Sequence, residues 1–168
     1  MARCYYGLAK QSHLRDIVVE VCNVLGHGAN AFAVDLMLET AAQETHCAQL
    51  RDSTPNGAGR GIFQIDPIAF NDICQRARPA DVTAVFNNFG IDIKSIRHDA
   101  LDYSPLVAAV FCRLFYKLIP EAIPATLIGR AEYWKKHYNT VKGKGSVGEY
   151  INNASIYASV CKKKKKTL

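Results

Sequence analysis

The sequence lacks any long apolar run. No stretch approaches the roughly 18 consecutive apolar residues that a membrane-spanning helix needs, and no apolar segment of signal-peptide length follows the basic residues of Met1 to Lys10. We therefore expect no transmembrane segment and no secretory signal. A protein of this kind is expected to reside at first in the cytoplasm in which it is made.

The cysteines lack the spacing of a metal site. None of the six forms a C-x-x-C pair, and none has a histidine at zinc-ligand spacing. An even number would permit three disulfides, but without a secretory signal the reduced state is expected. Cys22 and Cys112 lie in apolar helical stretches and are interpreted as small core residues. The sequence thus predicts no metal, no cofactor and no catalytic thiol.

The net charge of +6 predicts an anionic partner, such as nucleic acid, an acidic membrane surface or a bacterial envelope. Nucleic acid is disfavoured because the lysines gather at the C-terminus and do not alternate with aromatic residues on one face. This run is expected to be a solvated, disordered tail that could attract an anionic envelope. It consists of Lys162, Lys163, Lys164, Lys165 and Lys166. With 168 residues, the chain suits one domain over 1–161 and a basic tail over 162–168.

Apolar residues recur at helical spacing through most of the chain. Helices are predicted at 13–25 and 31–45, and a polar, glycine-rich stretch and a short strand-like run, Ile62 to Ile65, follow them. Helical patterns then resume to the end, at 67–76, 80–89, 103–118, 125–138 and 147–160. The predicted fold is mainly α, with a small β-hairpin inserted after the second helix.

Glu44 is the most informative acidic residue. It ends an apolar helix and shares a face with Met37, Thr40 and Ala41. A carboxylate is unfavourable near a helix C-terminus, so its position calls for a reason. Partial burial would raise its pKa and let it protonate the leaving oxygen of a glycosidic bond at neutral pH. Glu39, five residues earlier and on a different face, is the rival acid.

Two segments around Glu44 resemble the motif of soluble lytic transglycosylases and goose-type lysozymes. They are Gln-Glu-Thr at 43–45 and Gly-Ile-Phe-Gln-Ile-Asp-Pro at 61–67. In those families a Glu-Ser pair ends a helix, a glycine-rich turn leads to Gly-Leu-Met-Gln, and the next helix follows at once. Here Thr45 replaces the serine. The resemblance covers 36–70, about a fifth of the chain.

A second, shorter resemblance lies nearer the C-terminus. Tyr138-Asn139-Thr140 is similar to the Tyr-Asn-Ala-Gly motif that closes the cleft in those families. The stretch from Tyr133 to Gly145, with its Gly-Lys-Gly, resembles bacteriophage proteins of the same class. Trp134, within that stretch, is interpreted as a core residue because a lone tryptophan in a helical pattern is usually buried.

The resemblance implies roles for individual residues. Glu44 matches the catalytic acid, Gln64 the glutamine that helps hold substrate, and Tyr138 the tyrosine near the acid. Asp66 matches the goose-type aspartate thought to position water, but before a proline it is also a natural helix N-cap. Asp52 is an off-register candidate for a second aspartate and is equally typical of an Asx-turn.

The resemblance implies a lysozyme-like fold and cleavage of the bond between N-acetylmuramic acid and N-acetylglucosamine in peptidoglycan. Such a protein would be a phage endolysin, which waits in the host cytoplasm for release to the cell wall, or a virion-associated muralytic enzyme. A lysozyme and a lytic transglycosylase both stay possible, because only one carboxylate is secure. A non-catalytic phage tail or injection protein with the same fold is the alternative.

Overall fold

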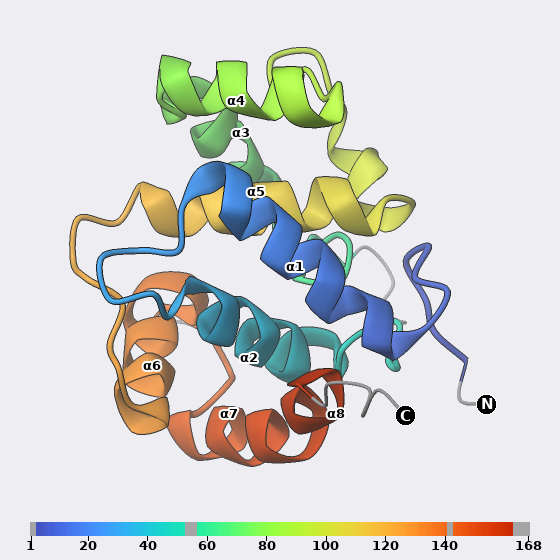
Figure 1. Ribbon diagram of the computed structural model, residues 1–168. Coiled ribbons are helices and arrows are strands. Elements are labelled where there is room, and N and C mark those ends of the chain that lie inside the picture. The colour runs from blue at the N-terminus through green and yellow to red at the C-terminus, as the bar shows by residue number, and fades with distance from the viewer. Residues whose placement is uncertain (1–2, 53–56, 141–142, 163–168) are drawn as a thin grey trace, which may run out of the picture.

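The computed structural model describes residues 3–52, 57–140 and 143–162, and the part described is mainly helical, as predicted (Figure 1). The α-helices are α1 (Gln11–Leu25), α2 (Ala33–Thr45), α3 (Pro67–Arg76), α4 (Pro79–Phe89), α5 (Pro105–Lys117), α6 (Leu127–Trp134), α7 (Val147–Asn153) and α8 (Ser159–Lys162). A 3₁₀ helix, η1 (His98–Asp102), precedes α5, and π-helical turns extend α6 (η2, Lys135–Asn139) and α7 (η3, Ala154–Ala158).

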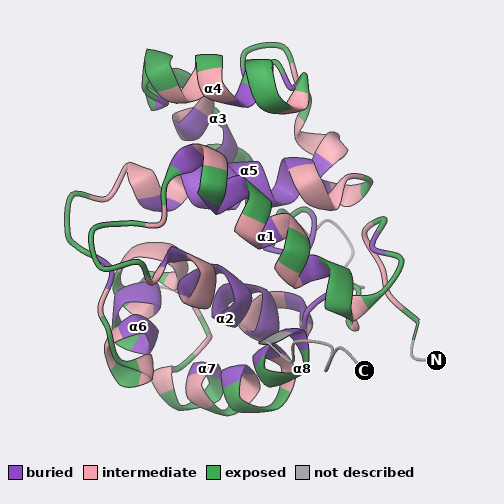
Figure 2. Cartoon of the chain, in the orientation of Figure 1, coloured by how far each residue is buried: buried purple, intermediate pink, exposed green. Residues whose placement is uncertain are grey.

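Helix α2 lies at the centre of the arrangement. It packs against α1 and α5 on one side and against α7 and η3 on the other, and α3 and α4 lie beyond α5 (Figure 1). Nine of its thirteen residues are buried, whereas α4 and α7 turn exposed faces outward (Figure 2). A helix that is apolar on most sides is expected to be enclosed in this way. The C-terminal end of α2 therefore emerges from the core carrying Glu44.

The predicted β-hairpin is wrong for the residues that the structure describes. The segment after the glycine-rich stretch has one antiparallel bridge, Arg60 with Ile65, and no strand. Ile62 and Phe63 are both fully buried, so two consecutive side chains enter the core where a strand would alternate them. The chain makes this bend with positive φ at Gly61 (72°) and Gln64 (51°). The result is a tight loop that presents Gln64 beside the core.

The remaining expectations have mixed outcomes. Cys22 and Cys112 are buried core residues, as predicted, and the six cysteines are free thiols. Among the described residues, no helix is long and apolar enough to cross a membrane. Residues 163–168, with four of the five tail lysines, lie outside the described part of the chain.

Candidate active site

Glu44 lies in the last turn of α2 and is partly buried. The indole Nε1–H of Trp134 donates a hydrogen bond of 3.1 Å to its Oε1. Burial raises the pKa of Glu44 to about 7, and the Trp134 hydrogen bond lowers it only in part. A carboxyl group in this condition is substantially protonated near neutral pH, as a general acid must be.

The turn that follows Glu44 is held by the next residue. Thr45 is buried, and its hydroxyl donates to the carbonyl of Ile62 at 2.7 Å and accepts from the amide of Ala48 at 3.1 Å. A serine would supply the same hydroxyl, so the departure from the family motif keeps the chemistry. His46 ends the helix in a left-handed conformation and stacks on Tyr157 at 4.0 Å. His46 is thus partly buried.

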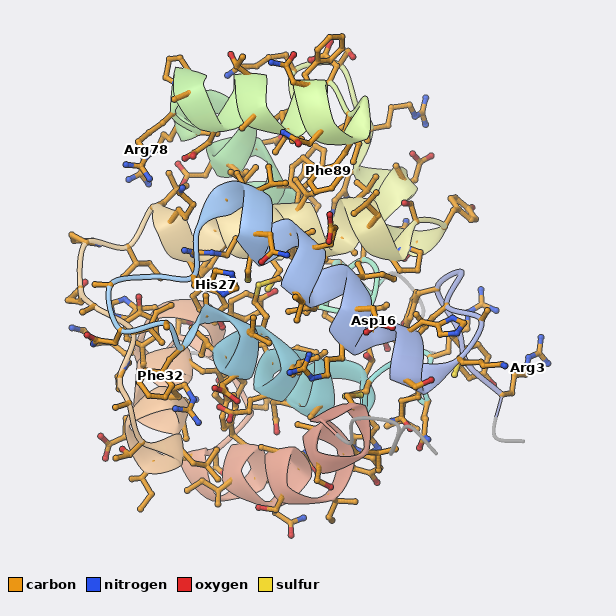
Figure 3. The ribbon with its side chains drawn as sticks, viewed as in Figure 1. Arg3, Asp16, His27, Phe32, Arg78 and Phe89 are labelled. Atoms are coloured by element: carbon orange, nitrogen blue, oxygen red, sulfur yellow. The ribbon has the colours of Figure 1, made fainter. Side chains whose placement is uncertain are left out.

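Glu39, the rival acid, belongs to a buried ion pair. Arg130 donates from Nε to Oε2 at 2.7 Å and from Nη2 to Oε1 at 2.8 Å, and the Tyr150 hydroxyl donates to Oε2 at 3.3 Å. Both charged side chains are almost completely buried. Arg130 also lies over the ring of Phe32 at 5.4 Å, in the region where Figure 3 labels that phenylalanine. These contacts link α6 to α2, and we interpret Glu39 as a residue that supports the packing of these two helices.

Trp134 is fully buried, as its place in the helical pattern predicts, and it packs on Tyr150 with ring centroids 5.1 Å apart. The two glycines of the Gly-Lys-Gly stretch lie against Trp134 and Asn139, where a side chain would not fit. A Cβ on Gly145 would lie 2.6 Å from Cη2 of Trp134, and one on Gly143 would lie 2.2 Å from the Asn139 carbonyl oxygen. Lys135 secures the loop by donating to the Asn139 side chain at 2.7 Å and to the Gly143 carbonyl at 2.9 Å.

Tyr138, on the π-helical turn η2, is hydrogen-bonded to the tight loop and interacts electrostatically with Glu44. Its hydroxyl donates to the carbonyl of Phe63 at 2.6 Å, and its ring packs edge-on against Phe115 at 4.8 Å. Burial raises its pKa well above the ordinary value, and nearby charges, including that of Glu44, raise it further. The two residues that the resemblance pairs are therefore close enough to interact electrostatically.

Gln64 and Asp66 share a small hollow of about 40 Å³ with Tyr138. The Gln64 amide donates to the Gly61 carbonyl at 2.8 Å and to the Tyr6 hydroxyl at 3.2 Å. Asp66 is the N-cap of α3, and its Oδ1 accepts from the Ala69 amide at 2.8 Å. The capping role that its sequence context indicates is present, and its catalytic role stays a prediction.

A larger hollow of about 520 Å³ has Tyr6 and Asp52 in its wall. The Asp52 amide donates to the Tyr6 hydroxyl at 3.0 Å. Asp102, in the same wall, accepts from Arg60 at 2.7 Å and from the Gly61 amide at 2.8 Å. Tyr6 therefore connects Asp52 to Gln64, and Asp102 fixes the start of the tight loop.

Sequence reasoning missed three of these residues as site components: Trp134 as a donor to Glu44, Tyr6 as a bridge and Asp102 as an anchor. Each contacts a partner at least 41 positions away, so no local pattern marks it. In the part of the chain that the structure describes, no group of three potential ligands could hold a metal ion. Comparisons with protein-family models, with curated proteins and with solved structures gave no match.

Proposed function

We propose that this chain has a lysozyme-like fold and cleaves the β-1,4 bond between N-acetylmuramic acid and N-acetylglucosamine of peptidoglycan, with Glu44 as its general acid. The observation that carries the proposal is the enclosure of Glu44 at the end of the buried helix α2, where the Trp134 indole donates a hydrogen bond to its Oε1 and burial raises its pKa to about 7. Proton donation to a leaving alkoxide requires such a group, because an ordinary carboxyl is already ionised at neutral pH.

The hollow that Gln64 and Tyr138 line supports a sugar-binding role for these two residues. Gln64 holds its amide toward Tyr6 and lines the hollow that Tyr138 closes. The larger hollow beyond Tyr6 carries further aromatic rings, Tyr5 and Tyr103, together with charged residues. Aromatic faces and polar groups of this kind suit a bound glycan chain.

A lytic transglycosylase mechanism is favoured over that of a lysozyme. Asp66 is exposed and its Oδ1 is engaged as a helix cap, which leaves Glu44 as the acid with the required environment. In this mechanism Glu44 gives its proton to the leaving oxygen of N-acetylglucosamine. The 6-hydroxyl of N-acetylmuramic acid then attacks its own anomeric carbon, and its proton goes to the Glu44 carboxylate. The product carries a 1,6-anhydro end and no water is consumed.

The setting proposed for this activity is phage-type degradation of the host cell wall, by an endolysin or a virion-associated enzyme. The lysine run from Lys162 to Lys166 would add attraction to an anionic envelope. That attraction should weaken as salt rises, because the Debye length is about 8 Å at physiological ionic strength.

Digestion of purified sacculi tests the proposal. Wild-type protein is expected to release muropeptides whose masses show 1,6-anhydro ends. Glu44→Gln should release them at least about 100-fold more slowly, since the amide cannot donate the proton. Glu132→Gln, which changes an exposed carboxylate on α6, is the matched control and should keep wild-type activity.

Three outcomes would contradict parts of the proposal. Reducing ends in place of anhydro ends would make the enzyme a lysozyme. Full activity in Glu44→Gln would show that the acid is wrong. Inactive wild-type protein that is folded would favour the non-catalytic tail or injection protein.

A further inference from the structure

A hollow of about 360 Å³ lies where the C-terminal ends of α1 and α5 meet the segment that joins α5 to α6. Its wall combines apolar side chains, among them Ile119, Pro120 and Ile123, with the cations Arg78, Arg113 and Lys117. Arg78 lies at the outer edge of the molecule (Figure 3). The hollow adjoins Gly28 and Ala29, which precede the first turn of α2, whereas Glu44 lies in its last turn. The hollow is therefore separate from the candidate active site.

Arg113 is a buried cation that forms no ion pair with any residue that the structure describes. It is 4% exposed, and its Nε donates to the Gly26 carbonyl at 2.8 Å. That bond caps the end of α1 but uses only one of the five guanidinium donors. In the described part of the chain the two Nη groups make no hydrogen bond, and neither is sealed from solvent. They can still donate to a bound anion.

The carboxylates near this hollow are held by other cations. Lys117 donates from Nζ to Asp81 at 2.7 Å, and Lys136 donates to Glu121 at 2.8 Å. Burial lowers the pKa of the Arg113 guanidinium, and neighbouring groups, among them Asp81, offset this only in part. A buried charge without a close partner is costly, so an anion that reaches Arg113 would bind favourably.

We propose that this hollow binds a small organic carboxylate with an apolar body, whose two oxygens accept hydrogen bonds from the Nη groups of Arg113. A guanidinium presents its donors as a planar fork that matches a carboxylate. The apolar body would lie against Ile119, Pro120 and Ile123. One carboxylate balances the single charge of Arg113, which favours it over a phosphate dianion. The inference does not depend on the proposed glycan cleavage.

The size of the hollow limits the ligand. A volume of about 360 Å³ is near the lower end of the range of roughly 300–1,000 Å³ that is typical of small-molecule sites. A short-chain acid fits this limit, and hexanoate is a suitable probe.

Titration of the full wild-type chain with hexanoate, followed by NMR of the backbone amides, tests the site. Saturable shifts are expected at residues 25–29 and 113–123. The uncharged 1-hexanol has the same chain and should bind at least about tenfold more weakly, because it cannot form charged hydrogen bonds with Arg113. Inorganic phosphate, which has no apolar body, should not displace hexanoate at equal concentration.

Three variants separate the charge from the shape of the hollow. Arg113→Gln should weaken hexanoate binding at least about tenfold. Ala122→Trp adds a bulky side chain at an exposed position in the wall and should weaken binding by a similar factor while Arg113 is kept. Arg97→Gln removes an equal charge from an exposed site outside the hollow and should bind as wild type does.

Several results would overturn the inference. These are the absence of saturable shifts at 25–29 and 113–123, equal binding of 1-hexanol, and displacement of hexanoate by phosphate at equal concentration. Wild-type affinity in Ala122→Trp would also exclude the hollow. Because that variant keeps Arg113, it decides the question even if Arg113→Gln folds poorly.

Discussion

The replacement Glu44→Gln is expected to stabilise the protein at alkaline pH while abolishing its activity. In the folded chain the pKa of Glu44 is about 7, against 4.5 for an unperturbed glutamate. The folded state thus binds this proton more tightly than the unfolded state does. Its contribution to stability is complete below pH 4.5 and is lost as the pH rises through about 7.

The size of the effect follows from the shift. A difference of this order, at about 1.4 kcal/mol per pH unit, corresponds to at most about 3 kcal/mol. Glutamine does not titrate and keeps an oxygen for the Trp134 indole. Glu44→Gln should therefore match wild type at pH 4 and exceed it by up to about 3 kcal/mol at pH 8.

Urea unfolding at a series of pH values measures this difference directly. Glu132→Gln, on an exposed site of α6, should give a small difference that hardly varies with pH. A flat curve for Glu44→Gln, or lower stability than wild type at pH 8, would show that Glu44 is ionised at no cost in the folded protein. The reasoning that makes it the acid would then fail.

Two further predictions concern the neighbours of Glu44. Trp134→Phe removes the donor that lowers the pKa of Glu44. The alkaline limb of the pH–activity profile should therefore move up from about 7 by roughly one pH unit, which is the equivalent of one hydrogen bond to a charged group. An unchanged or lowered limb would show that this bond does not set the pKa of Glu44. Asp66→Asn should leave both turnover and stability nearly unchanged, because asparagine caps a helix about as well as aspartate, whereas Asp66→Ala should cost about 1 kcal/mol in a urea melt. A 100-fold loss of turnover in a stable Asp66→Asn, with reducing ends in the wild-type products, would instead give Asp66 the role of the base.

The helices, and the partial burial of the carboxylate at the end of α2, could be predicted because both depend on short-range patterns. The apolar spacing through α2 fixes its burial, and a carboxylate at its end is visible in the sequence as an anomaly. The cap at Asp66 follows from the adjacent proline in the same way. The lack of strands among the described residues could not be foreseen, because Ile62 and Phe63 have strand-like side chains, but both are buried in the core.

The residues that contact Glu44 could not be predicted from the sequence, for a different reason. Trp134 lies 90 positions away along the chain, on the same helix, α6, as the Arg130 that pairs with Glu39 of α2. Gly145 has no local turn role that would mark it, and its need for a small residue arises from the Trp134 ring. Such requirements belong to packing between distant segments, so one sequence does not display them.

The two glutamates of α2 show how one helix supports opposite chemistries. Glu39 is enclosed with a guanidinium that makes two hydrogen bonds to it, so its negative charge is balanced where it lies. Glu44, five residues further on, is buried beside a neutral indole that donates one hydrogen bond. Both burial and the helix dipole oppose its ionisation. The ion pair at Glu39 holds α6, and α6 in turn brings Trp134 to Glu44. The ion pair at Glu39 and the indole at Glu44 thus both join α2 to α6, one around a balanced charge and the other around a carboxyl whose ionisation burial opposes.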